Sequence, residues 1–378
     1  MIGHRVCVRC VMDTTDSQIT FDERGFCNHC RFYEEHTARL IYGDEKGRSQ
    51  LGDMVAQAKH EGRSKAYNVI IGLSGGVDSS YLGLKARELG LRPLAIHLDN
   101  SWDSEPAVHN IERVVRTLEL DLVTHVVDWQ EFRDIQRAFI AAGVVDIELI
   151  TDHAITALAH RVARDQGIRW VLSGTNHVTE SIMPTTWMHR KTDLRNLKAI
   201  HRRFGTRPLR TLPTLSMVEL QWNLNVRRLR SIAVLNYLPY TRAGAIEELQ
   251  RELGWQDYGG KHHESLWTRF YQAHILPVKF GVDKRKAHLS AQICSEQISR
   301  DEALRILEDP LYPPAELRHD QDYVLKKLGF TETQFAEIMA TPPRRHLDFA
   351  SDESYIAPLL AGKRLAREAA GKVRRRAG

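Results

Sequence analysis

Long hydrophobic runs are missing from this chain of 378 residues. Its longest apolar stretches, such as residues 69–71 and 231–235, are far shorter than the ~20 residues that a membrane-spanning helix needs. The first residues also lack the apolar region of a secretion signal. We therefore expect no membrane span and a cytoplasmic protein.

A strong net charge is missing as well, because the formal charge is only +5. Residues 361–378 carry seven Lys and Arg residues against one Glu, so the rest of the chain is close to neutral. Nucleic-acid-binding proteins usually concentrate positive charge on a folded face. This distribution argues against nucleic acid as a partner, and we interpret the basic tail as a solvated chain end.

Cysteine is scarce, with five residues, but four of them form a pattern. Cys7, Cys10, Cys27 and Cys30 have the spacing C-x2-C-x16-C-x2-C, which fits a template for zinc binding. A redox CxxC motif is the competing interpretation, but it needs neither two matched pairs nor this spacing. Four thiolate ligands close the coordination sphere of zinc, so we predict a structural Zn²⁺.

A regular alternation of apolar runs and helical patterns follows the cysteine region. The apolar runs predict strands, the first of them fully buried, and the segments between them have the 3.6-residue period of amphipathic helices. Alternating strands and helices indicate an α/β fold with a doubly wound parallel sheet. Strands are expected at residues 69–73, 94–98, 122–127 and 170–173, and residues 299–340 are predicted to be helical.

A glycine-rich segment lies directly after the first predicted strand and opens the next helix. Its glycines allow backbone N–H groups to approach a phosphate, and the helix N-terminus adds positive potential. It lacks the GK[ST] ending of a Walker A loop. It resembles the PP-loop of the ATP pyrophosphatases, which implies ATP binding through the β,γ-pyrophosphate. The residues assigned to this loop are Ser74, Gly75, Gly76, Asp78, Ser79 and Ser80.

Two further polar segments follow the second and fourth predicted strands, where doubly wound sheets bind their ligands. Asp99 ends the first of these strands, and Gly174, Thr175 and Glu180 follow the other. The second segment is similar to the Gly-Thr…Glu-Ser segment of PP-loop synthetases such as GMP synthetase. Asp78 and Glu180 are candidates for the carboxylates that Mg²⁺ needs beside phosphate oxygens. For each acid alone, a turn or helix-cap role remains equally open.

Three later segments, residues 236–242, 258–265 and 279–290, resemble the N-acetyl sugar amidotransferases of bacterial surface-polysaccharide and LPS O-antigen synthesis. The resemblance also includes the sequence around the four cysteines. It implies an ATP-dependent ligase that converts an acetamido group of a nucleotide-activated sugar to an acetamidino group, with release of AMP and pyrophosphate. Lys279, Lys284 and Arg285 would join Asp78 as catalytic residues, with His288 as a further donor. Without the resemblance, the basic cluster would be read as a solvated helix face.

The resemblance also suggests a division of the chain into four segments. These are a zinc-ribbon module (1–45), a PP-loop ATP-binding α/β domain of the adenine-nucleotide alpha-hydrolase-like type (46–185), a substrate-binding segment (186–298) and a helical region with the basic tail (299–378). Within the third segment, residues 190–210 are rich in Arg and Lys. They could bind a sugar nucleotide, a protein partner or RNA, and the sequence does not separate these.

No glutaminase is apparent to supply ammonia. Cys294, the fifth cysteine, lies in a predicted helix without the sharp turn of a glutaminase nucleophile. We interpret it as a structural thiol. The resemblance implies that ammonia comes from a separate glutaminase together with a cyclase-like partner.

Two other functions remain open. One is a PP-loop tRNA-modifying enzyme that adenylates a base carbonyl, against which the neutral body of the chain argues. The other is a non-catalytic zinc-ribbon adaptor that binds through its basic tail, against which the intact glycine-rich loop with Asp78 argues.

Overall fold

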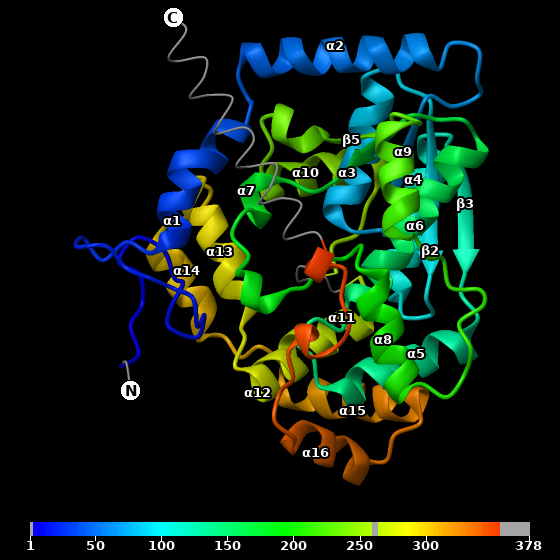
Figure 1. Ribbon diagram of the computed structural model, residues 1–378. Helices are drawn as coiled ribbons and strands as arrows, with labels where there is room; N and C mark the ends of the chain where they lie inside the picture. The colour runs from blue at the N-terminus through cyan, green and yellow to red at the C-terminus, as the bar shows by residue number, and fades with distance from the viewer. Residues whose placement is uncertain (1–2, 259–263, 356–378) are drawn as a thin grey trace, which may run out of the picture.

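The computed structural model describes residues 3–258 and 264–355 (Figure 1). Its centre is a five-stranded sheet in the order β3-β2-β1-β4-β5, and all four pairs of neighbouring strands are parallel. This arrangement confirms the doubly wound α/β fold expected from the sequence. The strands are β1 (Val69–Gly72), β2 (Pro93–Asp99), β3 (Asp121–Val126), β4 (Trp170–Ser173) and β5 (Arg230–Ala233).

Helices cover both faces of the sheet because alternate strand residues point to opposite sides. Ile71 and Ala95 pack into one hydrophobic core with α3 (Val77–Glu88), α4 (Glu105–Thr117) and α10 (Arg242–Leu253). Ile70 and Leu94 pack into the other core with α5 (Trp129–Ala142) and α6 (Leu149–Asp165). All five carboxyl ends lie at one edge of the sheet, followed after β4 by α7 (His177–Glu180).

The two edge strands were not predicted equally well. β3 was expected, and its residues are intermediate or exposed because it is an edge strand with one neighbour. β5 was not predicted. It has only four residues at the other edge, and Arg230 at its start obscures the apolar pattern.

The N-terminal module packs against helices from the C-terminal half (Figure 1). It contains α1 (Asn28–Phe32) and a π-helix, η1 (Tyr33–Thr37), before η2 (Ala38–Leu40) and α2 (Glu45–Glu61). Its neighbours are α13 (Lys284–Cys294) and α14 (Arg300–Glu308). The Val11 amide donates to Ser290 Oγ over 3.2 Å, and the Arg300 guanidinium donates to the carbonyls of Cys7 and Cys10.

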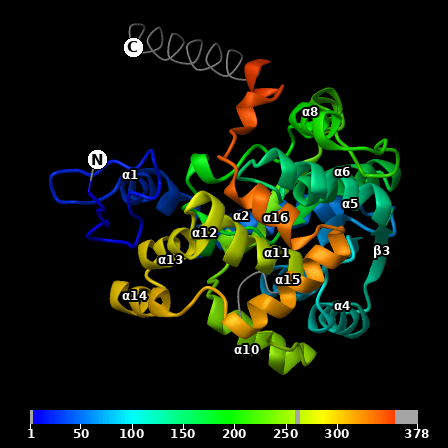
Figure 2. The same ribbon diagram turned by 90° about the horizontal axis from the view of Figure 1, so that it is seen from below.

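Further helices gather below the carboxyl ends of the strands (Figure 2). Thr331 and Gln334 form a capping box, and the Ser299 side chain accepts from the Glu302 amide. The helices of the chain that have not yet been given bounds are η3 (Thr185–Trp187), α8 (Leu194–Phe204), α9 (Met217–Asn225), η4 (Val234–Tyr237), α11 (Leu266–Phe270), η5 (Tyr271–Ile275), α12 (Leu276–Phe280), α15 (Pro314–Leu328), α16 (Glu332–Ala340) and η6 (His346–Asp348).

Among the described residues, no helix is long and apolar enough to cross a membrane. The basic tail beyond residue 355 and the glycine and histidine residues at 259–263 lie outside the described residues. The division of the chain into four segments stays a prediction.

Candidate functional site

The glycine-rich loop connects β1 to α3 at the carboxyl edge of the sheet. Gly75 has φ +77°, and a Cβ there would lie 2.3 Å from the carbonyl oxygen of Ala107, so only glycine fits. The Gly75 carbonyl accepts from the indole of Trp255 over 3.1 Å. The Ser79 hydroxyl accepts from the Ser74 amide and donates to the Gly76 carbonyl. These contacts hold the loop around the start of the helix.

A cavity of about 220 Å³ lies above this loop. The sequence-predicted residues that line it are Ser74, Gly76, Asp78, Ser79, Gly174, Thr175 and Glu180. Gly174 allows β4 to approach α3 closely, because a Cβ there would lie 3.1 Å from the carbonyl oxygen of Asp78. Ser80 is instead fully buried in the first turn of α3. The structure therefore brings two segments about 100 residues apart in the chain together around one hollow.

Several residues of this cavity were not assigned a role from the sequence. They are Arg242, Tyr258 and Glu264, together with Tyr240 behind Asp78. The Tyr240 hydroxyl donates to Asp78, and burial followed by the charge of Asp78 raises the pKa of Tyr240. These residues belong to the segments 236–242 and 258–265, whose resemblance was noted without a function for each position.

Three carboxylates face this cavity: Asp78, Glu180 and Glu264. Mg²⁺ is usually held by one or two carboxylates together with phosphate oxygens and water. This set of hard oxygen donors, next to a helix N-terminus suited to phosphate, fits a magnesium nucleotide.

A larger cavity of about 580 Å³ adjoins the first and shares Ser74, Ser79, Thr175, Glu180 and Glu264 with it. His97 also lines it, with Nε2 3.2 Å from Asp103 Oδ2. Burial alone would lower the pKa of His97, but the pairing with Asp103 outweighs it and raises this pKa. The two cavities together offer room for ATP and a second substrate.

Only part of the predicted basic cluster reaches this cavity. Lys284 lines it together with His288, one helical turn further along α13. Lys279 lies elsewhere, with Nζ 2.6 Å from the Ile338 carbonyl and 2.7 Å from the Thr341 carbonyl. Arg285 pairs with Asp283 and donates to the Asp309 carbonyl. The structure therefore does not bring Lys279 and Arg285 to the site.

Asp99 is also outside the cavity lining. Its Oδ1 accepts from the Ser101 amide over 2.8 Å, which stabilises the turn after β2. Its neighbours Leu98 and Asn100 line the larger cavity instead. This is the turn role that the sequence left open for such an acid.

Lys191 is the member of the basic segment 190–210 that lines the larger cavity. Its Nζ lies 2.8 Å from Asp146 Oδ1 and 2.9 Å from Asp152 Oδ2. Burial would lower the pKa of Lys191, but these two carboxylates outweigh it and raise the pKa. Other basic residues of this segment, such as Arg202 and Arg207, are exposed to solvent.

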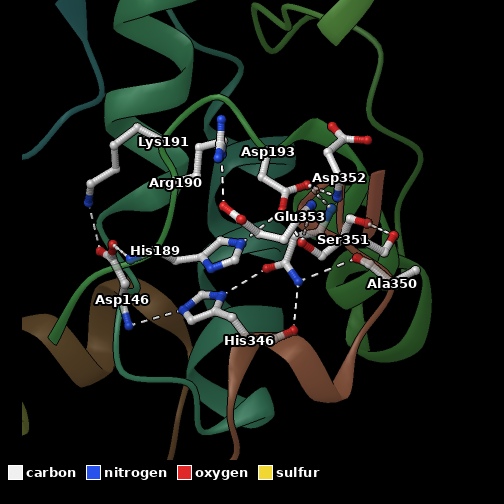
Figure 3. A network of polar contacts seen from close by, with 12 residues as sticks. Asp146, His189, Arg190, Lys191, Asp193, His346, Ala350, Ser351, Asp352 and Glu353 are labelled. Carbon is white, nitrogen blue, oxygen red and sulfur yellow. Dashed lines mark hydrogen bonds and ion pairs between the residues drawn. The ribbon is translucent and has the colours of Figure 1, made fainter. Parts of the chain in front are cut away.

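A polar network fixes the backbone around Lys191 (Figure 3). Asp146 also accepts from the His189 amide over 2.7 Å. The rings of His189 and His346 stack with centroids 4.4 Å apart. His346 Nε2 accepts from the Asp146 amide, so Nδ1 donates to Asn196 Oδ1 over 2.8 Å. The C-terminal segment around His346 is thereby tied to a wall of the cavity.

The four predicted zinc ligands lie together in the N-terminal module. Their sulfur atoms are all within 4.8 Å of one another, and all four cysteines are buried. Backbone amides of Cys27 and Met12 donate to Cys7 Sγ and Cys10 Sγ, as is common for thiolates. Four soft donors in this arrangement fit a tetrahedral Zn²⁺. Cys294 lies beside the group, with Sγ 3.8 Å from Cys30 Sγ.

The protein is an α/β protein with a parallel sheet whose first strand leads through a Ser-Gly-Gly-Val-Asp-Ser-Ser loop into a helix, and this loop resembles a PP-loop. Residues 264–363 match the family model of the C-terminal domain of WbpG-like LPS biosynthesis proteins. This match confirms, over that part of the chain, the resemblance noted from the sequence. No curated protein matched the chain.

Three solved structures align with parts of this chain at low sequence identity and low TM-score. An NH3-dependent NAD synthetase from Campylobacter jejuni has 16% identity and a TM-score of 0.30, covering 57% of this chain and 88% of its own. An NMN synthetase from Francisella tularensis has 13% identity and a TM-score of 0.28, covering 60% and 92%. A predicted tRNA methyltransferase subunit from Methanocaldococcus jannaschii has 16% identity and a TM-score of 0.27, covering 48% and 72%.

Proposed function

We propose that this protein is an ATP-dependent amidotransferase that converts an acetamido group of a nucleotide-activated sugar to an acetamidino group. The observation that carries the proposal is the junction of two cavities at the N-terminus of α3. One cavity offers a phosphate-binding loop, and the other places Lys284 and His288 near that loop. The match to WbpG-like LPS biosynthesis proteins supports a sugar acceptor.

ATP binds with its β- and γ-phosphates at the backbone N–H groups of residues 75–79, at the start of α3. Asp78, Glu180 and Glu264 would hold Mg²⁺, which neutralises phosphate charge when bound. Clamping the terminal phosphates makes pyrophosphate the leaving group and exposes the α-phosphorus to attack.

An amide carbonyl is a weak electrophile, so the reaction needs two steps. The acetamido oxygen attacks the α-phosphorus, which forms an O-adenylyl imidate and releases pyrophosphate. Ammonia then adds to the imidate carbon, and the C–O bond breaks to release AMP with the former amide oxygen. Lys284 and His288 are placed to stabilise the negative charge that develops on the phosphates.

Ammonia comes from a separate glutaminase with a cyclase-like partner in this proposal. Among the described residues, Cys294 is buried beside the cysteine cluster, where it has no access to glutamine. Because the reaction consumes ATP and an activated sugar, we place the protein in the cytoplasm.

Phosphorus NMR of the purified chain with Mg-ATP and candidate UDP- and CMP-sugars tests this proposal. With ammonium as the nitrogen source, we expect the phosphorus spectrum to show AMP and pyrophosphate. Mass spectrometry should show a sugar product in which NH has replaced one oxygen. Glutamine alone should give no product. Formation of ADP and orthophosphate, or full activity with glutamine and no second protein, would contradict the mechanism.

A further inference from the structure

A third cavity of about 360 Å³ separates the N-terminal module from the segment that follows α7. Asp16, Asn28 and Phe32 line it from the module, and Ser181 and Met183 line it from the opposite side. Its volume lies within the range of about 300–1,000 Å³ that is typical of small-molecule sites. It is large enough to bind a ligand of its own.

This third cavity adjoins the catalytic one through a shared wall. Met183 lines both cavities, and Glu180 faces the catalytic side only three residues earlier. Hydrogen bonds across the module boundary fix the wall: the Thr185 hydroxyl donates to Gln18 Oε1, and the Thr186 hydroxyl donates to Asp16 Oδ1, each over 3.0 Å. The two cavities therefore lie on either side of this segment.

The lining of the third cavity is polar but carries no Lys or Arg among the described residues. Its carboxylate, Asp16, is already paired with His29 over 2.7 Å. A phosphate group would find no cation here. The lining favours an uncharged, hydrogen-bonding part of a ligand instead.

One side chain indicates what that part is. Phe32 lines the cavity and is 59% exposed. Its ring is tilted against His36 with centroids 4.8 Å apart, and its exposed surface offers a flat apolar ring to a planar partner.

We propose that this cavity binds the nucleoside part of the nucleotide-activated sugar, with the base against Phe32 and the sugar directed past Met183 toward Glu180. The inference rests on the acceptor class of the proposed function. In this proposal the N-terminal module has a direct role in binding the acceptor, because its residues form one wall of the acceptor site.

Calorimetry with UDP, CDP and GDP tests the subsite. Each is titrated into protein saturated with a non-hydrolysable ATP analogue, so that the phosphate loop is already occupied. We expect one of the three to bind with a stoichiometry of one per chain. Absence of binding for all three, or displacement by the ATP analogue, would overturn the proposal.

Matched variants locate the binding. Phe32→Leu keeps an apolar side chain but removes the ring, and should weaken nucleoside diphosphate binding by about tenfold. Phe26→Leu changes a phenylalanine of the same module that does not line the cavity, and should leave affinity unchanged. Equal affinity of the Phe32→Leu variant and the wild type would refute the subsite.

The result is independent of turnover. If a nucleoside diphosphate binds in a Phe32-dependent manner but no acetamidino product forms, the subsite stands and the proposed reaction falls. If product forms but Phe32→Leu leaves the KM for the sugar nucleotide unchanged, the reaction stands and the subsite falls.

Discussion

Lys284 Nζ lies 3.3 Å from Glu148 Oε2, although the two residues come from opposite halves of the chain. The Gln272 amide donates to the same carboxylate oxygen over 3.1 Å. This pairing holds the lysine at the wall of the large cavity, where an arriving anion can contact its ammonium group. It also distinguishes Lys284 from Lys279, which lies outside the cavity.

Substitution of these two lysines should have different effects. Lys284→Met removes a positive charge from the cavity, so we expect kcat to fall by about tenfold or more, since removal of one electrostatic donor commonly costs 10²–10³. Lys279→Met should leave kcat nearly unchanged and lower the melting temperature, because its Nζ bonds to backbone carbonyls near Thr341. Steady-state kinetics of pyrophosphate release and thermal melts measure both. Equal loss of kcat in the two variants would contradict the assignment.

Substitutions of two glycines in the phosphate loop should affect ATP binding and protein stability differently. A side chain at Gly76 would enter the cavity, since its Cβ would already lie 3.2 Å from Ser74 Oγ and 3.3 Å from Tyr258 Oη. Gly76→Val should therefore abolish detectable ATP binding in calorimetry while the fold persists. Gly75→Ala should instead destabilise the protein, because of its positive φ and the contact with Ala107.

Gly52 provides the control for these variants. It lies inside α2, and a Cβ there meets nothing within 4 Å. Gly52→Ala should keep ATP affinity and raise stability by about 0.5–1 kcal/mol, as expected for this change in a helix. Wild-type ATP affinity in Gly76→Val would mean that the phosphates bind elsewhere.

The parts of the site that the sequence predicts well are local. The phosphate loop is one continuous segment between a strand and a helix, and the cysteine spacing follows from the geometry of two turns. The sequence did not predict which members of the basic cluster reach the cavity, because Gly281 turns the chain with φ +66° between α12 and α13. Lys279 and Lys284 therefore point in different directions.

Helical spacing would have helped within α13. Lys284 and His288 are four residues apart and share a helix face, whereas Arg285 is turned away from that face. The third carboxylate, Glu264, and the wall residue Lys191 depend on contacts between distant segments. No pattern within a single segment reveals such contacts.

The four clustered cysteines should bind one zinc ion per chain. Cys27→Ser removes one of four thiolates and should lose the metal and much of the soluble protein, because structural zinc in small modules contributes an apparent ~10–16 kcal/mol. Cys294→Ser is the control, since this thiol lies beside the group rather than within it. Elemental analysis should find one equivalent in the control variant. Wild-type protein with less than about a tenth of an equivalent would refute the site.

His346 should make the C-terminal segment sensitive to acid. Burial, followed by the charge of the stacked His189, lowers the pKa of His346 to about 3, far below its ordinary value of 6.5. Between these two values the unfolded chain takes up a proton that the folded chain does not bind. Its contribution to stability is therefore complete above pH 6.5 and is lost as the pH falls toward 3.

Chemical denaturation at pH 7.5 and pH 5.5 measures this effect. One such proton changes the free energy of unfolding by at most about 1.4 kcal/mol per pH unit. His346→Gln should remove this contribution to the pH dependence. His36→Gln changes an exposed histidine of η1 and should leave the slope as in the wild type.

Since His346 accepts from the Asp146 amide, His346→Gln should also loosen the wall that carries Lys191 and raise the KM of a substrate. An unchanged slope in His346→Gln would show that this histidine is not buried in its neutral form.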